Sequence, residues 1–174
     1  SLAEQLDRAR DIRPANLPST RRGSSSLRPE KPQAPAQLEF FNGLGGFVND
    51  GREYLTILEG NERTPMPWIN VVTNERFGFQ VSEAGSGFTW SENSHERRLT
   101  PWSNHPVSDP VGEDVYLRDE ETAEFWTPTP APCGGQATTV VRHGQGFTRF
   151  TQSSNGLEQD LLILISPTAP VKLF

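Results

Sequence analysis

The sequence predicts an all-β fold, an antiparallel β-sandwich that begins near Leu38. Apolar residues beyond that point recur with a period of two rather than 3.6, as in Phe77, Phe79 and Val81. Turn residues, such as those at 154–156, separate the candidate strands. No helical pattern of ten or more residues follows Leu38, whereas a parallel sheet would need crossover helices. Together these observations favour antiparallel strands packed as a sandwich.

The first 37 residues are expected to form a separate segment. Leu2, Leu6 and Ala9 share one helical face, which predicts a short helix over 1–12. Residues 13–37 are rich in Pro, Ser and Arg and hold too little apolar material to offset the entropy of ordering, which predicts a disordered linker. All 16 aromatic residues lie at Phe40 or later, so the core is expected within residues 38–174.

The expected strands are short runs bounded by turn residues at 49–51, 59–61, 84–87 and 154–156. In chain order they cover residues 53–58, 68–73, 77–82, 87–90, 114–118, 138–143, 146–151, 157–165 and 171–174. The strand over 157–165 places Leu161, Ile163 and Ile165 on one face. The final run has no turn after it, which predicts an incomplete sandwich with an open edge that pairs with another copy.

The charge balance argues against some classes of partner. The chain carries 16 Lys and Arg against 22 Asp and Glu, a net charge of −6. Residues 1–37 hold seven basic and four acidic residues, so the remaining nine basic and 18 acidic residues give the sandwich a net charge of −9. An acidic domain without a basic face is not expected to bind nucleic acid. No stretch approaches the roughly 18 apolar residues that span a bilayer, so no membrane contact is expected of this chain.

The cysteine and histidine content suggests neither a disulfide nor a metal site. Cys133 is the only cysteine, which fits a reducing compartment and predicts a cytoplasmic location. His95, His105 and His143 lack the spacing of metal ligands. The glycine-rich run 43–46 lacks the flanking elements of a phosphate-binding loop, so it is interpreted as a loop that needs positive φ. No metal or cofactor is therefore expected.

Paired carboxylates raise the possibility of glycoside hydrolysis, which uses two of them. Glu92 and Glu96 have i, i+4 spacing, but their segment lies between strands and gives no reason for a helix. The acidic run over 113–124 is typical of a solvated turn. Because neither group identifies a general acid, no catalytic residue is predicted.

The most unusual segment, residues 88–110, combines two tryptophans with amides, arginines and carboxylates. Its three prolines favour a fixed loop. This mixture suits a sugar site, because flat CH faces stack on aromatic rings while hydroxyl groups need paired polar partners. On composition alone, burial of Trp90 and Trp102 as core anchors is the more common outcome.

Many short motifs in a fixed order resemble one family. They include FFNGLGGF (40–47), DGREY (50–54), TPMPWIN (64–70), SEAGSG (82–87), PVSDP (106–110) and RHGQGF (142–147). Over about residues 38–174 the chain resembles the amino-terminal β-sandwich of glycoside hydrolase family 94, the cellobiose-phosphorylase-like enzymes formerly classed as glycosyltransferase family 36. Within the family it is most similar to the phosphorylase-like regions of cyclic β-1,2-glucan synthases.

The resemblance implies a galactose-mutarotase-like supersandwich that is truncated at its C-terminus. Family members cleave β-glucosides with phosphate, or run the reverse reaction, through one carboxylic acid on a separate (α/α)6 barrel. That barrel is absent from this chain, so the fragment alone is expected to be inactive. The implied partners are the C-terminal barrel, a second copy in a homodimer and a β-linked gluco-oligosaccharide, with β-1,2 linkages favoured. An inner-membrane parent with this region on its cytoplasmic side is compatible with the resemblance.

The resemblance also places residues 90–104 where the family carries a loop that reaches the acceptor end of a sugar site. It therefore favours a role near the sugar for this loop. His95 and His105 stand where the synthase pattern has Arg and Asp, so neither receives a charge-based role. The expected substrate-binding residues are Trp90, Asn93, Glu96, Arg97, Arg98, Trp102 and Asn104. Two alternatives stay open: a purely structural or dimerising sandwich without sugar contact, and an independent glycosidase that uses Glu92 or Glu96.

Overall fold

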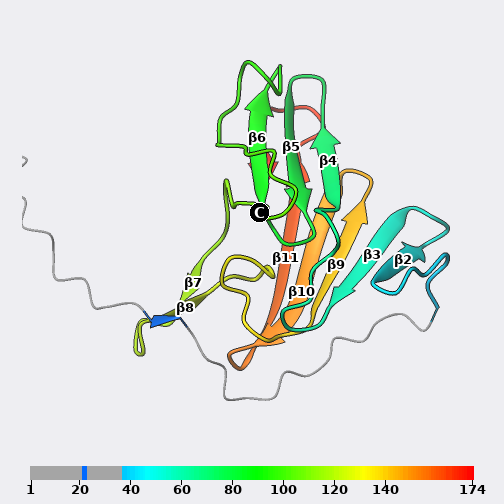
Figure 1. Ribbon diagram of the computed structural model, residues 1–174. Helices are drawn as coiled ribbons and strands as arrows, with labels where there is room; N and C mark the ends of the chain where they lie inside the picture. Colours follow the sequence, from blue (N-terminus) through cyan, green and yellow to red (C-terminus); the bar gives the residue numbers. More distant parts are fainter. Residues whose placement is uncertain (1–20, 23–36) are drawn as a thin grey trace, which may run out of the picture.

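The computed structural model describes residues 21–22 and 37–174 (Figure 1). All the regular elements within these residues are strands, β1 to β12, which confirms the predicted all-β class. The described part contains no helix long and apolar enough to cross a membrane. The helix expected over 1–12, and the linker apart from residues 21–22 and 37, lie outside the described residues.

The larger sheet has six antiparallel strands in the order β12-β11-β10-β9-β3-β2. Its strands are β12 (Lys172–Leu173), β11 (Leu157–Ile165), β10 (Phe147–Ser154), β9 (Thr139–Gly144), β3 (Glu53–Leu58) and β2 (Gly45–Val48). Strands β10 and β11 form a hairpin in which Asn155 and Gly156 have positive φ, of 52° and 75°. This is the backbone that an Asn-Gly turn favours, because both residues tolerate the left-handed region.

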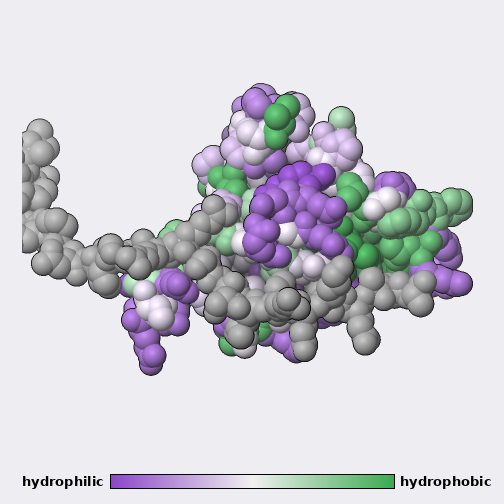
Figure 2. Space-filling model, turned by 60° about the horizontal axis from the view of Figure 1, so that its bottom comes forward, coloured by the Kyte–Doolittle hydropathy of each residue, from purple (hydrophilic) through white to green (hydrophobic). Residues whose placement is uncertain are grey.

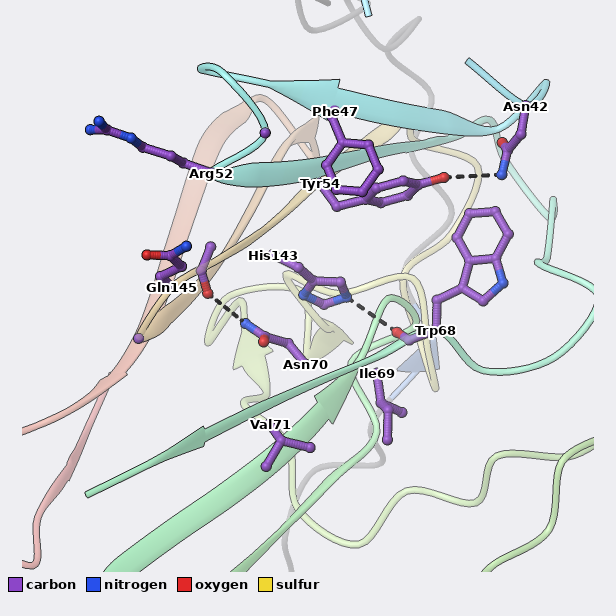
Figure 3. A pocket seen from close by; sticks show the side chains of 13 residues that line it. Asn42, Phe47, Arg52, Tyr54, Trp68, Ile69, Asn70, Val71, His143 and Gln145 are labelled. Atoms are coloured by element: carbon purple, nitrogen blue, oxygen red, sulfur yellow. Dashed lines mark hydrogen bonds between the residues drawn. The ribbon is translucent and has the colours of Figure 1, made fainter. Parts of the chain in front are cut away.

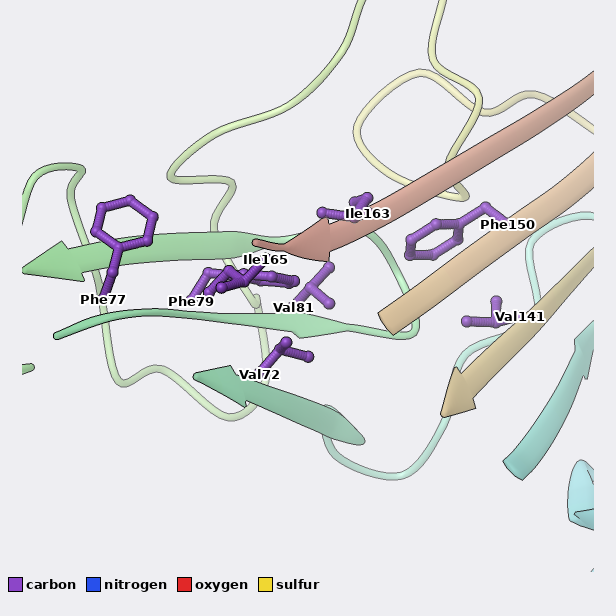
Figure 4. Packing of buried hydrophobic residues seen from close by; sticks show 8 residues of the cluster. All are labelled: Val72, Phe77, Phe79, Val81, Val141, Phe150, Ile163 and Ile165. Carbon is purple, nitrogen blue, oxygen red and sulfur yellow. The ribbon is translucent and has the colours of Figure 1, made fainter. Parts of the chain in front are cut away.

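The smaller sheet packs its inner face on the larger one. It consists of β4 (Ile69–Thr73), β5 (Phe77–Ser82) and β6 (Gly87–Ser91), in that order. The side chains that the period of two predicted to face inward, Phe77, Phe79 and Val81, pack with residues of β9 to β11. Figure 4 shows this core, whose members are Val72, Phe77, Phe79, Val81, Val141, Phe150, Ile163 and Ile165.

The outer face of the smaller sheet, which points away from the larger sheet, is also covered by other residues where it is formed by β5 and β6. Gly78 and Ser82, which alternate with the core residues, are both buried. A Cβ atom added to Gly78 would lie 2.3 Å from the ring of Trp90, so the indole rests directly on the backbone of β5. The segment between β6 and β7 therefore forms a further layer, while the β4 side chains Ile69 and Val71 stay exposed.

Two expectations for local structure were right only in part. Residues 45–46 belong to strand β2, and glycine is required there by close packing, because a Cβ atom at Gly45 would lie 2.5 Å from the Leu55 carbonyl oxygen. Positive φ occurs in this run only at Gly43. The acidic run 113–124, interpreted as a solvated turn, does form an exposed turn at 120–122, and β7 (Leu117–Arg118) lies within the strand expected over 114–118. The interpretation was wrong at the two ends, because tertiary contacts partly bury Glu113 and Asp114, and Glu124 begins strand β8 (Glu124–Trp126). β8 also pairs in parallel with the two-residue β1 (Arg21–Arg22), the one parallel pair of the described strands.

The larger sheet is wider than the smaller one, so part of the inner face of the larger sheet is uncovered. Phe47, Tyr54 and His143 are cross-strand neighbours on that face of β2, β3 and β9. None of them belongs to the core between the sheets. Apolar surface gathers on the side of the molecule where β2 and β3 lie (right in Figure 2). Phe40 and Phe41, which come shortly before β2 in the chain, are exposed. The uncovered end of the larger sheet therefore offers both apolar and polar side chains to other molecules.

Candidate functional site

The loop that follows β6 is held in shape by its own hydrogen bonds. The side-chain oxygen of Asn93 accepts hydrogen bonds from the backbone N–H groups of His95 (2.8 Å) and Glu96 (2.9 Å), which makes an Asx turn. An isolated bridge pairs Trp90 with Arg98 and returns the chain to the edge of β6. Asn93 is thus a residue that shapes the loop.

Three aromatic rings stand in a row on the outer face of β6. The buried Phe88 lies between Trp90, with ring centres 5.2 Å apart, and Trp102, with ring centres 5.1 Å apart and an angle of 25° between the planes. The guanidinium carbon of Arg98 lies 5.1 Å from the centre of the Trp102 ring. The structure therefore brings together Trp90, Trp102 and Arg98 from the predicted set. Phe88 was missed, although the period of two places it on the same face as Trp90.

The two tryptophans have different surroundings. Trp90 is half-buried, with its ring against Gly78, so much of its surface serves the fold. Trp102 is 39% exposed, although it stacks on Phe88 and contacts Arg98. Of the two, Trp102 is the ring that offers more surface to a ligand.

Trp102 and Asn104 line a small cavity of about 170 Å³ beside the exposed side chain of Ile69 in β4. Met66, Ile69 and Gln80 contribute to the same lining. Its combination of apolar surface with amide donors and acceptors can contact CH groups and hydroxyl groups at once. The volume is below the roughly 300–1,000 Å³ of complete ligand pockets, so the cavity is too small to enclose a whole oligosaccharide.

Glu96 and Arg97 face other residues of the loop region. Arg97 pairs with Glu92, whose carboxylate also lies 3.6 Å from Arg76. Glu96 contacts the His95 ring at 2.6 Å. These side chains are exposed, and neither Glu96 nor Arg97 lines the cavity beside Trp102. Such exposed ion pairs add at most about 1 kcal/mol each to stability.

Two carboxylates, Glu83 and Asp109, hold the segments around the cavity. Glu83, only 2% exposed, accepts a hydrogen bond from the backbone N–H of Trp68 (2.7 Å) and another from the hydroxyl of Thr64. Burial raises the pKa of Glu83, and the nearby charge of Asp109 adds to the effect. Asp109 accepts a hydrogen bond of 2.5 Å from Ser82. The segments 64–68 and 102–110 are thus held over β5 by carboxylates that are already engaged.

The arrangement does not resemble a pair of catalytic carboxylates. Glu92 and Glu96 are exposed, with Glu92 paired to Arg97 and Glu96 in contact with His95, whereas a general acid needs an enclosed site that raises its pKa. Asp114 has a pKa raised to about 7 by burial, but the cavity beside it has a volume of only about 10 Å³. Within the described residues no group of three or more His, Cys, Asp or Glu side chains could hold a metal ion, and Cys133 is a free thiol.

Fold and loop together define a class of protein: an antiparallel sandwich domain that presents aromatic and amide groups on a fixed loop. The chain belongs to the glycosyl hydrolase 94 family, because residues 52–174 match the family model described as "Glycosyl hydrolase 94, supersandwich domain". This match confirms the family that the sequence motifs indicated. It also identifies the chain as the supersandwich domain of phosphorylase-like enzymes and related synthases.

Several relatives are similar over most of the chain. The cyclic beta-(1,2)-glucan synthase NdvB of Rhizobium meliloti (strain 1021) is 37% identical over 99% of this chain and 6% of its own length. The N,N'-diacetylchitobiose phosphorylase of Vibrio furnissii is 31% identical over 65% of this chain and 14% of its own length. The 3-O-beta-D-glucopyranosyl-beta-D-glucuronide phosphorylase of Paenibacillus borealis is 32% identical over 70% of this chain and 14% of its own length. The chain therefore spans a small part of each of these relatives.

Proposed function

We propose that this chain is a non-catalytic sandwich domain of a carbohydrate phosphorylase or of a cyclic β-1,2-glucan synthase-type glycosyltransferase, and that residues 90–104 contribute to a sugar subsite. Family membership and the names of the relatives support a sugar substrate for the complete enzyme. The observation that carries the proposal is the placement of Trp102, whose ring is fixed by Phe88 yet exposed beside a cavity that Asn104 also lines. The sugar would be a β-linked gluco-oligosaccharide, with β-1,2 linkages favoured.

The other partners follow from the same proposal. Within the complete enzyme, the sandwich packs against a C-terminal (α/α)6 barrel that carries the catalytic acid, and it contributes to a homodimer. The exposed Phe40 and Phe41 support such protein contacts, because exposed apolar side chains that lie together often mark interfaces. We place the domain in the cytoplasm, which the free thiol of Cys133 supports.

A second candidate function is a purely structural or dimerising sandwich. The observation in its favour is the packing of Trp90 on Gly78 and the stacking of Trp102 on Phe88, which give both tryptophans a role in the fold. Substituting the two tryptophans separates the two candidates.

Trp102→Ala in the complete enzyme is expected to lower kcat/KM for the sugar acceptor while leaving the melting temperature nearly unchanged. A stacking contact contributes about 1–3 kcal/mol, so the loss is expected to be about 5- to 150-fold. Trp90→Ala is the matched comparison, and as an anchor on β5 it is expected to cost about 3–5 kcal/mol of stability. Acceptor kinetics and thermal unfolding of both variants test this prediction. If both variants unfold, or if both keep normal kinetics, the structural alternative holds instead.

The 174-residue chain by itself is expected neither to phosphorolyse nor to hydrolyse β-glucans. Its exposed carboxylates lack an enclosed site, and the absence of a general acid alone typically costs about 10²–10⁴-fold in rate. Product release from β-1,2-glucan should therefore stay at the level of a protein-free control. Turnover by the pure chain that disappears in Glu92→Gln or Glu96→Gln would instead support the independent glycosidase.

A further inference from the structure

A second and larger pocket lies at the uncovered end of the six-stranded sheet (Figure 3), with a volume of about 740 Å³. Its lining comes from four of the motifs quoted above, which supply Asn42, Arg52, Tyr54, Trp68 and His143 among others. The volume lies within the roughly 300–1,000 Å³ typical of small-molecule pockets. The pocket exists because the inner face of β2 and β3 extends beyond the edge of β4, the first strand of the smaller sheet. None of the residues expected to bind sugar from the loop 90–104 lines it.

Three aromatic side chains form one wall of the pocket. The rings of Phe47 and Tyr54 meet edge to face with centres 5.0 Å apart, and those of Tyr54 and Trp68 do so at 5.8 Å. The amide of Asn42 donates a hydrogen bond of 3.0 Å to the Tyr54 hydroxyl, which fixes that ring. Phe47 is 38% exposed, so part of the aromatic wall is accessible to a ligand. A fixed, partly exposed aromatic wall suits the flat CH face of a sugar ring.

A chain of hydrogen bonds fixes the back of the pocket. The Asn70 side-chain amide donates to the Thr148 hydroxyl (3.0 Å), which lies 3.1 Å from Nδ1 of His143. Nε2 of His143 lies 3.2 Å from the Trp68 carbonyl oxygen. A carbonyl can only accept, so Nε2 carries the proton and Nδ1 accepts from Thr148. Burial lowers the pKa of His143 to about 4, so the ring is neutral at neutral pH.

The pocket offers polar groups that are almost all uncharged. Arg52 is the one permanently charged lining residue, and its side chain extends away from the aromatic wall (Figure 3). No carboxylate lines the pocket. The exposed amide of Gln145 and the side-chain oxygen of Asn70 make no hydrogen bond to the described residues and can serve as donor and acceptor. Uncharged donors and acceptors beside aromatic rings match a polyol better than an anion, which would need more than one cation.

We propose that this pocket is a second carbohydrate-binding site, separate from the loop 90–104, and that it holds an uncharged gluco-oligosaccharide against Phe47, Tyr54 and Trp68. Trp68 links the two regions, because Ile69, the next residue, lines both this pocket and the cavity beside Trp102. The site rests on the proposed function only for the choice of sugar. In the complete enzyme it would hold part of a glucan chain outside the catalytic barrel.

The indole N–H signals of the four tryptophans allow a direct test in the ¹⁵N-labelled chain. Trp68 reports on the pocket, and Trp90 and Trp102 report on the loop. Trp126 is a control, because it is buried and donates a hydrogen bond of 3.1 Å to Gln159. On titration with a linear β-1,2-linked glucotriose, the Trp68 signal is expected to shift saturably while the Trp126 signal stays fixed.

Two variants and a matched control locate the binding. Phe47→Ala is expected to weaken the affinity seen at Trp68 about tenfold through loss of stacking. Gln145 lies in an exposed turn, so Gln145→Ala should not destabilise the fold. This variant is expected to weaken the affinity for the sugar about fivefold. Gln136→Ala replaces another exposed glutamine, outside the pocket, and should leave the affinity unchanged. Circular dichroism checks that each variant is folded.

The outcomes separate this proposal from the proposed function. A Trp68 signal that does not move at millimolar sugar, or that still responds fully in both pocket variants, would overturn the second site. If Trp102 alone responds, the loop subsite stands and the pocket proposal fails. If inorganic phosphate shifts Trp68 and the sugar does not, the pocket is an anion site and the proposal is wrong.

Discussion

Glu113→Gln is expected to lower the free energy of unfolding by about 3–5 kcal/mol, because it leaves the ammonium group of Lys172 buried without its partner. Lys172 and Glu113 form an ion pair whose side chains are only 8% and 19% exposed. The Thr89 hydroxyl lies 2.9 and 3.0 Å from the two oxygens of Glu113. Burial lowers the pKa of Lys172, in opposition to the pairing.

The position of this ion pair explains why its loss is expected to matter. The ammonium nitrogen of Lys172 lies 4.4 Å from the centre of the Phe79 ring and 4.8 Å from that of Phe174. Lys172 belongs to β12 of the larger sheet, while Phe79 and Thr89 belong to β5 and β6 of the smaller one. The pair therefore connects the two sheets beneath the strand that carries Trp90.

A double-mutant cycle measures the coupling between these two charges. Lys172→Met alone and Glu113→Leu alone are each expected to cost about as much as Glu113→Gln, whereas the variant with both Lys172→Met and Glu113→Leu should lie much closer to the unmodified protein, because no charge is then buried alone. Asp160→Asn is the control: Arg149 and Asp160 are 43% and 58% exposed, and breaking that pair should cost less than about 1 kcal/mol. Urea unfolding of all the variants gives the comparison. If the loss in free energy of unfolding in the double variant equals the sum of the losses in the two single variants, the two charges are not coupled and the prediction is wrong.

The strands were predictable where local pattern and turn chemistry agree. The ranges expected for β3 and β11 match the structure because each strand follows a glycine-containing turn, at 49–51 and 154–156, and β11 has a period of two. Strand β8 was missed because its first residue closes an acidic run, and the cross-strand partners that make it a strand, in β7 and β1, lie elsewhere in the sequence. β2 was missed because its glycines suggested a loop, although close contact with Leu55 is the reason for one of them.

The candidate sites were predictable only in part. The segment 88–110 could be selected for its composition. The row of three aromatic rings on the outer face of β6 follows from strand periodicity, which places Phe88 and Trp90 on one face, and from the loop that brings Trp102 beside them. The larger pocket could not be predicted from local pattern. Tyr54 and His143 are 89 residues apart in the sequence and meet because β3 pairs with β9, and they stay open to a ligand because the larger sheet extends beyond the smaller one. Sequence patterns describe strands and faces, but they do not give the relative widths of two sheets.

Two buried titratable groups are expected to make stability depend on pH in opposite directions. Burial lowers the pKa of His143 from 6.5 to about 4, so its contribution is complete above pH 6.5 and is lost as the pH falls toward 4. Burial raises the pKa of Asp114 from 3.8 to about 7, so its contribution is complete below pH 3.8 and is lost as the pH rises toward 7. Glu83, whose pKa is also raised by burial, acts in the same direction as Asp114.

Few hydrogen bonds oppose the effect of burial on Asp114, whose Oδ1 accepts one from the backbone N–H of Val115 (2.7 Å). The Thr129 hydroxyl lies 2.8 Å from the Ala131 carbonyl oxygen and 3.2 Å from the nearer oxygen of Asp114. A hydroxyl has one proton, and the shorter contact to a group that can only accept takes it. Thr129 is then a weak donor to Asp114, so hydrogen bonding offsets only part of the cost of burying the charge of this carboxyl group.

Asp114→Asn is therefore expected to gain stability relative to the unmodified chain as the pH rises from 4 to 7. One pKa unit corresponds to about 1.4 kcal/mol, and because the carboxyl group is only half-buried, solvent screening reduces the expected gain to about 2 kcal/mol. In this variant the His143 dependence is no longer opposed by Asp114, so its stability should rise by up to about 3 kcal/mol between pH 4 and 6.5. His143→Gln is the matched variant, and its stability should fall over the same range. Urea unfolding between pH 4 and 7.5 measures all three proteins, and parallel curves would show that neither group changes its protonation on folding.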